Sequence, residues 1–403
     1  MKRSNKEFSI HRILFLVALF SIGIACSISI DPSFEMQSDN GELAQVVASP
    51  TGVDMTPSPI PAVTESVRPV YTPSFQGEYQ QDLVDRYWQF VSFPPDMYSP
   101  ITTLINQQNQ DIWYVKGVKG EKTFLNALLI TRDAGHTWEI HFENGGVYDL
   151  YLDPENSNHV YLGFNDELWL STDAGVTWSM LHDFEEEFVC QIFKSKRDGR
   201  LFVATGWQDL DKVGIYISDD NGKSWIFHSF NPTHDYYLPW DISEHPKTGA
   251  LYVIGEIADH PQPYQPVFYS SVDGGFAWEE RFDLPWHATS VGFSPVVNDV
   301  YMLTEGVGLY RSTNAGKTFK WLSNYFWASM KLDQNNQSVI YGGNHTYNNS
   351  GGVFLSYDGG YTFKDIGLQG KIISSIDLNN DSSRIYVSAY KEGIFFAETD
   401  TIY

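Results

Sequence analysis

A short segment that carries a hydroxyl, a carboxylate, a glycine and an aromatic ring within eight residues recurs along this chain. At residues 171–178 it reads STDAGVTW, and the carboxylate of Asp173 could act as a catalytic acid, ligate a metal ion or shape a turn. Five further copies follow the same pattern: TRDAGHTW (131–138), SDDNGKSW (218–225), SVDGGFAW (271–278), STNAGKTF (312–319) and SYDGGYTF (356–363). A catalytic acid requires one special copy, whereas a structural device repeats. We therefore expect a turn.

The chemistry of the segment supports that interpretation. The carboxylate can accept backbone N–H groups of a tight turn, the glycine can adopt a positive φ, and the hydroxyl can add local hydrogen bonds. The closing aromatic residue would then pack between neighbouring sheets. We expect this structural role for Asp133, Gly135, Trp138, Asp173, Gly175, Trp178, Asp220, Gly222, Trp225, Asp273, Gly275, Trp278, Asn314, Gly316, Phe319, Asp358, Gly360 and Phe363.

The spacing of the copies indicates the elements that position them. Their glycines are separated by 40, 47, 53, 41 and 44 residues, which is typical of a propeller or a solenoid. Each repeat contains four short runs with strand character; in 288–323 these are ATSVGFSP, DVYMLTE, GLYRST and TFKWLS. We name the four strands a to d from the inside of the ring outwards, so the octapeptide joins c to d. Strand a begins near Ile101, Val147, Val189, Pro239, Ala288, Ala328 and Ile373, which predicts seven blades.

The two ends of the folded region complement each other. The seventh repeat has strands a, b and c and then stops at Tyr403, whereas DRYWQFVSF at 85–93 resembles the d strands. The N-terminal strand would complete the last blade and close the ring. The sequence therefore predicts an all-β, seven-bladed propeller of four-stranded blades over residues 81–403.

The octapeptide resembles the Asp-box of the BNR-repeat superfamily, which includes sialidases, xyloglucan hydrolases, the sortilin family and photosystem II assembly factors. The resemblance implies the propeller fold and not one activity. Sialidases clamp a carboxylate with three arginines on the top face, which is formed by the d–a and b–c loops. Here the blade pattern places Arg132 and Arg311 at c–d turns and Arg197, Arg200 and Arg384 at a–b turns, all on the bottom face. Xyloglucan hydrolases use two propellers, whereas this sequence predicts one. The photosystem II assembly factors carry an arginine patch, and a patch of that kind is not evident in this sequence.

Composition narrows the classes of partner. The formal net charge of −24 repels nucleic acid and anionic headgroups.

The segment DLNNDS at 377–382 resembles the start of a calcium-binding loop, but Ser388 stands at the position of the bidentate Glu. We expect a hairpin turn there, and we expect neither a metal nor a cofactor.

The top face is the default site for a ligand, because loops on a rigid ring carry function. Our main interpretation is a non-catalytic binding or assembly module with a protein or neutral glycan partner. The tryptophans that precede strand a have an alternative role, which is packing at the centre of the ring. A glycoside hydrolase is the alternative activity, with a carboxylate pair drawn from Asp209, Asp235, Asp241, Glu256 and Asp259. The candidate ligand-binding residues are Trp207, Asp209, His234, Asp235, Tyr236, Trp240, Asp259, His260, Trp286, His287, Trp327, His345 and Tyr347.

The N-terminal region predicts export. A basic segment and a short apolar run end at Cys26, preceded by Gly-Ile-Ala, which resembles a bacterial lipobox. We expect a lipoprotein signal peptide at 1–25, lipidation of Cys26 and a disordered Pro/Ser/Thr-rich tether at 26–80. The only other cysteine, Cys190, would then be a free thiol. The expected product is a monomer held to the membrane only by its lipid anchor.

Overall fold

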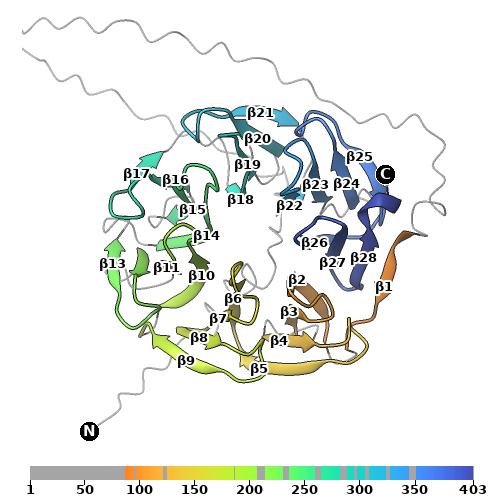
Figure 1. The fold of residues 1–403 in the computed structure, drawn as a ribbon, viewed down its shortest axis with the longest axis horizontal. Helices are drawn as coiled ribbons and strands as arrows, with labels where there is room; N and C mark the ends of the chain where they lie inside the picture. Colours follow the sequence, from red (N-terminus) through yellow and green to blue (C-terminus); the bar gives the residue numbers. More distant parts are fainter. Residues whose placement is uncertain are drawn as a thin grey trace, which may run out of the picture. The chain divides into compact units, whose positions relative to one another are not determined.

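The computed structural model contains a ring of seven four-stranded antiparallel sheets (Figure 1). The structure describes residues 87–94, 97–120, 125–185, 187–206, 214–229, 236–258, 265–281, 288–294, 297–304, 308–323, 327–344 and 351–402. Within these ranges no helix has the length and apolar character needed to cross a membrane. The predicted signal peptide, Cys26 and the tether lie outside the described residues.

Each blade is formed by strands that are consecutive in sequence. Blade 1 contains β2 (Ser99–Ile105), β3 (Trp113–Val118), β4 (Asn126–Thr131) and β5 (Glu139–Gly145); blade 2 contains β6 (Val147–Leu152), β7 (Val160–Phe164), β8 (Glu167–Ser171) and β9 (Ser179–Asp183); blade 3 contains β10 (Phe188–Lys194), β11 (Leu201–Gly206), β12 (Gly214–Ser218) and β13 (Ile226–Ser229); blade 4 contains β14 (Tyr236–Glu244), β15 (Leu251–Ala258), β16 (Gln265–Ser271) and β17 (Glu279–Arg281).

The remaining three blades follow the same order. Blade 5 contains β18 (Ala288–Phe293), β19 (Val300–Thr304), β20 (Gly308–Ser312) and β21 (Lys320–Ser323); blade 6 contains β22 (Trp327–Leu332), β23 (Ile340–Asn344), β24 (Gly352–Ser356) and β25 (Lys364–Gly367); blade 7 contains β26 (Ile373–Leu378), β27 (Arg384–Ala389), β28 (Gly393–Glu398) and β1 (Gln89–Val91). The predicted fold class, blade count and strand order are confirmed.

The N-terminal strand closes the ring as predicted. β1 pairs antiparallel with β28, with Phe90 opposite Phe395, so the last sheet has the order β1-β28-β27-β26. The indole N–H of Trp88 donates to the carbonyl of Ile366 in blade 6 at 2.9 Å. This closure joins the two ends of the described ring and removes an exposed sheet edge.

The core lies between the blades. The b strands β3, β11, β19 and β23 are buried along their whole length, because a neighbouring blade covers each of their faces. This is why they read as nearly continuous apolar runs and not as alternating ones. Between blades 7 and 1, for example, Tyr386 packs edge-on against Trp113 with ring centroids 5.5 Å apart.

All seven inner strands share a feature that sequence periodicity did not predict. Each has a β-bulge near its start, at Ile101, Tyr148, Cys190, Trp240, Thr289, Ala328 and Ser374. In four blades the side chain after the bulge accepts a backbone N–H from the next blade: Asp149 from Ile192 (2.7 Å), Asp241 from Val291 (2.9 Å), Ser329 from Ile376 (3.0 Å) and Ser375 from Thr103 (3.2 Å). These inter-blade hydrogen bonds hold the inner strands in register.

Candidate functional site

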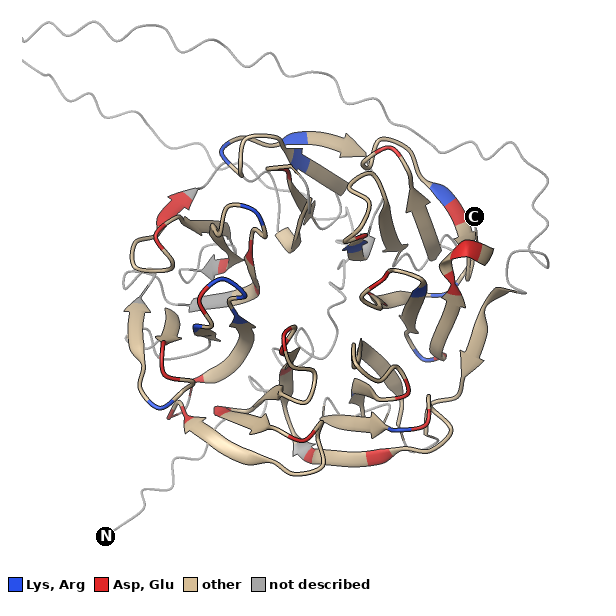
Figure 2. Ribbon diagram, viewed as in Figure 1, with Lys and Arg blue, Asp and Glu red and all other residues tan. Residues whose placement is uncertain are grey.

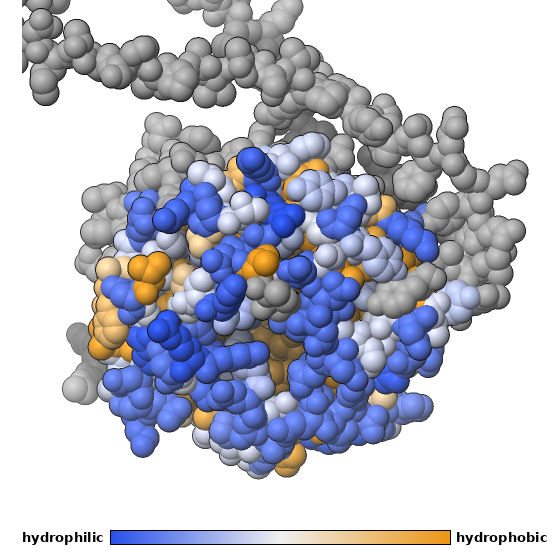
Figure 3. All heavy atoms as spheres, turned by 45° about the horizontal axis from the view of Figure 1, so that its top comes forward, coloured by the Kyte–Doolittle hydropathy of each residue, from blue (hydrophilic) through white to orange (hydrophobic). Residues whose placement is uncertain are grey.

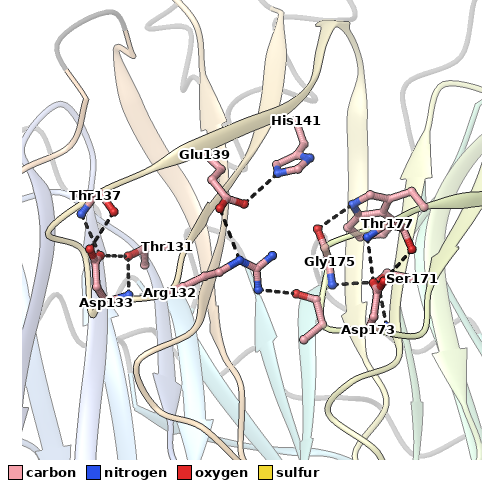
Figure 4. Close-up of polar contacts among 12 residues, drawn as sticks. Thr131, Arg132, Asp133, Thr137, Glu139, His141, Ser171, Asp173, Gly175 and Thr177 are labelled. Atoms are coloured by element: carbon pink, nitrogen blue, oxygen red, sulfur yellow. Dashed lines mark hydrogen bonds and ion pairs between the residues drawn. The ribbon is translucent and has the colours of Figure 1, made fainter.

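The recurring acid is fully engaged inside its own turn. In blade 2, Ser171 Oγ donates to Asp173 Oδ1 at 2.8 Å, and the Gly175 N–H donates to Ser171 Oγ at 2.8 Å (Figure 4). Thr177 donates its N–H to Asp173 Oδ1 at 2.8 Å and its hydroxyl to Asp173 Oδ2 at 2.6 Å. Both carboxylate oxygens are therefore occupied by groups four residues away or nearer.

The same contacts recur around the ring. Hydroxyl donation from the Thr or Ser four residues on, followed by turn N–H groups, lowers the pKa of Asp133, Asp173 and Asp220 to about 2. In blade 5 the amide Oδ1 of Asn314 accepts the Thr318 N–H at 2.9 Å, and its Nδ2 donates to the Thr318 hydroxyl at 2.9 Å. The turn thus forms without a charge, which is consistent with a structural role and offers no free acid.

The glycine of each turn is required by two independent constraints. Gly175 has φ +83°, and a Cβ there would lie 2.7 Å from Ile130 Cδ1 of blade 1. The sequence predicted one left-handed position, but the structure contains two, because Ala174 has φ +58°. The Ala174 N–H donates to the carbonyl of Asn158 in the a–b turn at 2.9 Å, which holds this less favourable conformation.

Side chains of the preceding blade also bind these turns. Arg132 Nη1 donates to the Ala174 carbonyl at 3.1 Å and lies beside Glu139 (Figure 4). The equivalent carbonyls, of Gly274 and Ala315, accept from Arg200 at 2.5 Å and from the Tyr252 hydroxyl at 3.0 Å. The closing aromatic residues pack the same way: Trp178 lies 5.3 Å from Phe142 of blade 1, Trp225 lies 5.5 Å from Phe184 of blade 2, and Phe319 lies 5.7 Å from Phe268 of blade 4.

Three of the candidate top-face residues have described side chains, and all three lie on the paired strands β14 and β15. Asp241 accepts the Val291 N–H and, at 2.7 Å, the Ser243 hydroxyl, and burial raises the pKa of its carboxyl. Trp240, the bulge residue before it, packs partly buried against the core between blades 4 and 5. Glu256 lies on β15 with Leu238 and Pro266 as its strand partners and is partly exposed.

The other candidate residues are only partly covered by the structure. Tyr236 and Trp327 begin inner strands β14 and β22, and nothing is described of their side chains. The rest lie outside the described residues: Trp207, Asp209, His234, Asp235, Asp259, His260, Trp286, His287, His345 and Tyr347.

Two titratable residues that the sequence analysis did not single out, Lys116 of blade 1 and Asp149 of blade 2, interact electrostatically. Lys116 on β3 donates from Nζ to the Tyr148 carbonyl at 2.8 Å, and burial lowers the pKa of its ammonium to about 8. Burial raises the pKa of the neighbouring Asp149 to about 6. Cys190, the free thiol, is buried beside them, and burial raises its pKa as well. A thiol held protonated in this way is a poor nucleophile.

The calcium-like segment forms a hairpin turn. Asp377 accepts the Lys331 ammonium at 2.7 Å, and Asn379 Oδ1 accepts the Arg384 N–H at 2.9 Å. Asp381 accepts the N–H of Ser383 at 3.0 Å. Among the residues that the structure describes, no cluster of His, Cys, Asp and Glu has the arrangement of a metal site.

Comparison with curated proteins finds sequence similarity to xyloglucanases. The chain is 25% identical to a xyloglucanase of Hypocrea jecorina over 253 residues, which is 50% of this chain and 29% of that protein. It is 24% identical to Xyloglucanase Xgh74A of Acetivibrio thermocellus over 280 residues, again 29% of that protein. The chain therefore spans less than a third of the length of these relatives. No protein-family model matches it.

Solved structures share the ring. YCF48 bound to D1 peptide superposes with a TM-score of 0.55 at 15% identity, covering 78% of this chain and 97% of that one. YCF48 from Cyanidioschyzon merolae gives 0.54 at 15% identity, with 78% and 99% covered. The extracellular domain of BT4673 from B. thetaiotaomicron gives 0.55 at 13% identity, covering 77% of this chain and 39% of that one. The chain thus has the β-propeller fold of these proteins, as the Asp-box resemblance implied.

Proposed function

We propose that this protein is a non-catalytic binding or assembly module that holds a protein or neutral glycan partner on the top face of its ring. The observation that carries the proposal is the position of Asp241. Its carboxylate accepts the Val291 N–H of the next blade and the Ser243 hydroxyl, so one of the candidate acids has a structural use in the ring. A glycosidase needs two carboxylates at a defined separation across a glycosidic bond.

A structural neighbour of similar length supports a binding role. The ring of YCF48, a protein whose structure is described as bound to D1 peptide, is covered over 97% of its length by this chain. A single propeller of this size is therefore sufficient for a peptide partner in that protein. Loops on a rigid ring suit the same task here.

A glycan-active hydrolase is the second candidate. The similarity to xyloglucanases, at 24–25% identity, is the specific observation that favours it. Glu256, Asp235 and Asp259 remain as its candidate carboxylates, together with Asp209.

We further propose that the ring is exported and lipid-anchored through Cys26, with residues 26–80 as its tether. A Cys26→Ser variant should leave the membrane fraction and enter the soluble fraction of the cell envelope. Its continued recovery with the membrane would contradict the anchor. The ring alone, residues 81–403, is the control for membrane binding through the propeller itself.

The binding face is tested by crosslinking and by an array of neutral glycans. A photoreactive residue at Trp207 or His345, which the proposal assigns to the top face, should crosslink the partner, whereas the same residue at Thr248 in a bottom-face turn should not. Variants Trp207→Ala and His345→Ala should lose glycan or peptide binding while retaining the unfolding midpoint of the parent. Equal crosslinking from Thr248, or unchanged binding in both variants, would contradict the top-face assignment.

A further inference from the structure

A polar pocket lies on the bottom face, between blades 3 and 4. Its volume is about 210 Å³, and it is lined by the β10–β11 turn, the β14–β15 turn and the β16–β17 turn. The first two turns have the same form: Gly199 and Gly249 have φ near +70°, and each donates its N–H to the carbonyl four residues before it. Both turns carry lysine or arginine, and Figure 2 marks such residues in blue in the loops near β10 and β14.

The floor of the pocket is fixed in place. Arg200, whose side chain is 15% exposed, donates to the Gly274 carbonyl at 2.5 Å and to Asp198 Oδ2 at 2.6 Å. Its guanidinium lies over Phe202 and Phe276, 5.6 and 5.2 Å from the ring centroids. Arg200 and the ring of Phe276 are therefore held in place before any ligand arrives, which reduces the entropic cost of a contact with that ring.

A second arginine, Arg197, interacts electrostatically with Glu244, which also lines the pocket. The guanidinium of Arg197 makes no hydrogen bond or ion pair with any residue that the structure describes, and the side chain is exposed. It lies directly over Gly249, where a Cβ would be 2.4 Å from Nη1. A planar guanidinium with unoccupied donors matches a carboxylate in a bidentate pair.

The turn of blade 4 also leaves one acceptor open. In blades 1, 2, 3 and 6 the Oδ2 atom of the turn acid accepts a Thr or Ser hydroxyl at 2.6–2.7 Å. In blade 4 that position is Ala277, and Oδ2 of Asp273 has no donor among the described residues. Asp273 lines the pocket. A ligand hydroxyl at this point would replace the hydroxyl that the other turns supply themselves.

The remaining lining excludes several ligand classes. Asp198, Glu244 and Asp273 line the pocket together with Arg197 and Arg200, which disfavours phosphate, sulfate and other multiply charged anions more strongly than a single carboxylate. The volume is below that of sites for drug-sized ligands and suits a single ring. Phe276, two residues after the lining residue Gly274, is 62% exposed, so its ring beside Arg200 still offers a surface on which a sugar ring can stack. The visible face is largely hydrophilic (Figure 3), and the charged and polar lining of the pocket favours a hydroxylated ligand over an apolar one.

We propose that this pocket binds one uronate unit of a polysaccharide, with its carboxylate on Arg197, a hydroxyl on Asp273 Oδ2 and its ring against Phe276. The site lies on the face opposite to the proposed top-face partner site and is independent of it.

The test uses the full ring and oligosaccharides of galacturonate or glucuronate, measured by titration calorimetry. Arg197→Gln should weaken uronate binding at least tenfold, whereas Lys196→Gln, which removes the same charge from the same turn, should not. Ala277→Thr supplies the missing hydroxyl to Asp273 and should also weaken binding, while raising stability or leaving it unchanged. Because this variant repairs a turn, its loss of affinity cannot come from unfolding.

Other outcomes would overturn the assignment. No binding of uronates to the parent ring would remove the site. Equal losses in Arg197→Gln and Lys196→Gln would reduce the effect to unspecific charge attraction. Equal affinity for the matched neutral oligosaccharides would show that the carboxylate has no role. Binding of an Asp- or Glu-containing peptide in place of uronates would refute a sugar as the ligand.

Loss of the top-face partner in Trp207→Ala with intact uronate binding would support the independence of the two sites.

Discussion

Replacing Asp241 separates a structural carboxylate from a catalytic one. In Asp241→Ala the Val291 N–H loses its acceptor between the inner strands of blades 4 and 5. The Ser243 hydroxyl can reorient and donate to a water molecule, so only the Val291 N–H is left unpaired. An unpaired N–H there lowers the free energy of unfolding by about 1–3 kcal/mol. With an unfolding entropy of roughly 2.1 cal/mol/K per residue over about 300 residues, the expected loss of Tm is about 2–5 °C.

The amide variant should behave differently. Asp241→Asn keeps an oxygen for Val291 and places an NH2 group near the Ser243 hydroxyl, while it removes a buried charge. Burial raises the pKa of Asp241 in the folded state, so the wild-type carboxyl contributes most stability below the pKa of the unfolded chain and loses it as the pH rises through the folded value. The Asn variant should therefore match the wild type near pH 4 and equal or exceed it near pH 8.

The assay is urea unfolding at pH 4 and pH 8, followed by intrinsic tryptophan fluorescence, with ligand binding and glycan hydrolysis measured on the same preparations. Ser329→Ala is the matched control, because its hydroxyl accepts the Ile376 N–H in the equivalent position between blades 6 and 7. The reasoning fails if Asp241→Asn retains its stability but abolishes hydrolysis or binding. It fails also if Asp241→Ala unfolds at the wild-type urea concentration.

Two further predictions concern the recurring turn. Gly175→Ala should lower the free energy of unfolding by at least about 1–2 kcal/mol, because its Cβ would meet Ile130 and its φ is +83°. Ala174→Gly should raise the free energy of unfolding by no more than about 1 kcal/mol. Equal losses in the two variants, measured by denaturant unfolding, would contradict the geometry. On acidification, the lowered pKa values of Asp133, Asp173 and Asp220 imply stability that is full above pH 4 and lost as the pH falls towards 2. The triple Asn variant, which copies the turn at Asn314, should show a flatter decline of the urea midpoint between pH 4 and pH 2.5, and an unchanged slope would refute the coupling.

The sequence predicted the ring well because the recurring octapeptide fixes the phase of every strand. With the c–d turn located, the alternating runs on either side could be assigned, and the inner strands begin within three residues of the predicted positions; strand a of blade 4, for example, was expected near Pro239 and begins at Tyr236. The closing strand was found because blade 7 lacked a partner for β28. Repetition thus supplied the long-range information that a single sequence normally lacks.

The contacts between blades could not be predicted in the same way. The bulge at Trp240 and the hydrogen bond from Val291 to Asp241 depend on how two sheets pack. The two hydrogen-bonded residues are 50 positions apart, and no pattern in the sequence indicates that they meet. The bottom-face pocket likewise joins Arg197, Gly249 and Asp273 from three separate turns. One signal was available: Ala277 is the single small apolar residue at a position where the other five turns have Thr or Ser.

The central claim is that the propeller binds its ligand without hydrolysing it. Mass spectrometry of glycans after incubation with the ring tests this claim most directly. Xyloglucan and a set of neutral polysaccharides are incubated with the parent protein, and bound and released material are analysed for new reducing ends. The account predicts retention of a ligand with no new ends above those formed with a heat-denatured sample. New reducing ends that vanish in Glu256→Gln, in a variant with the parent's unfolding midpoint, would contradict it and identify a hydrolase.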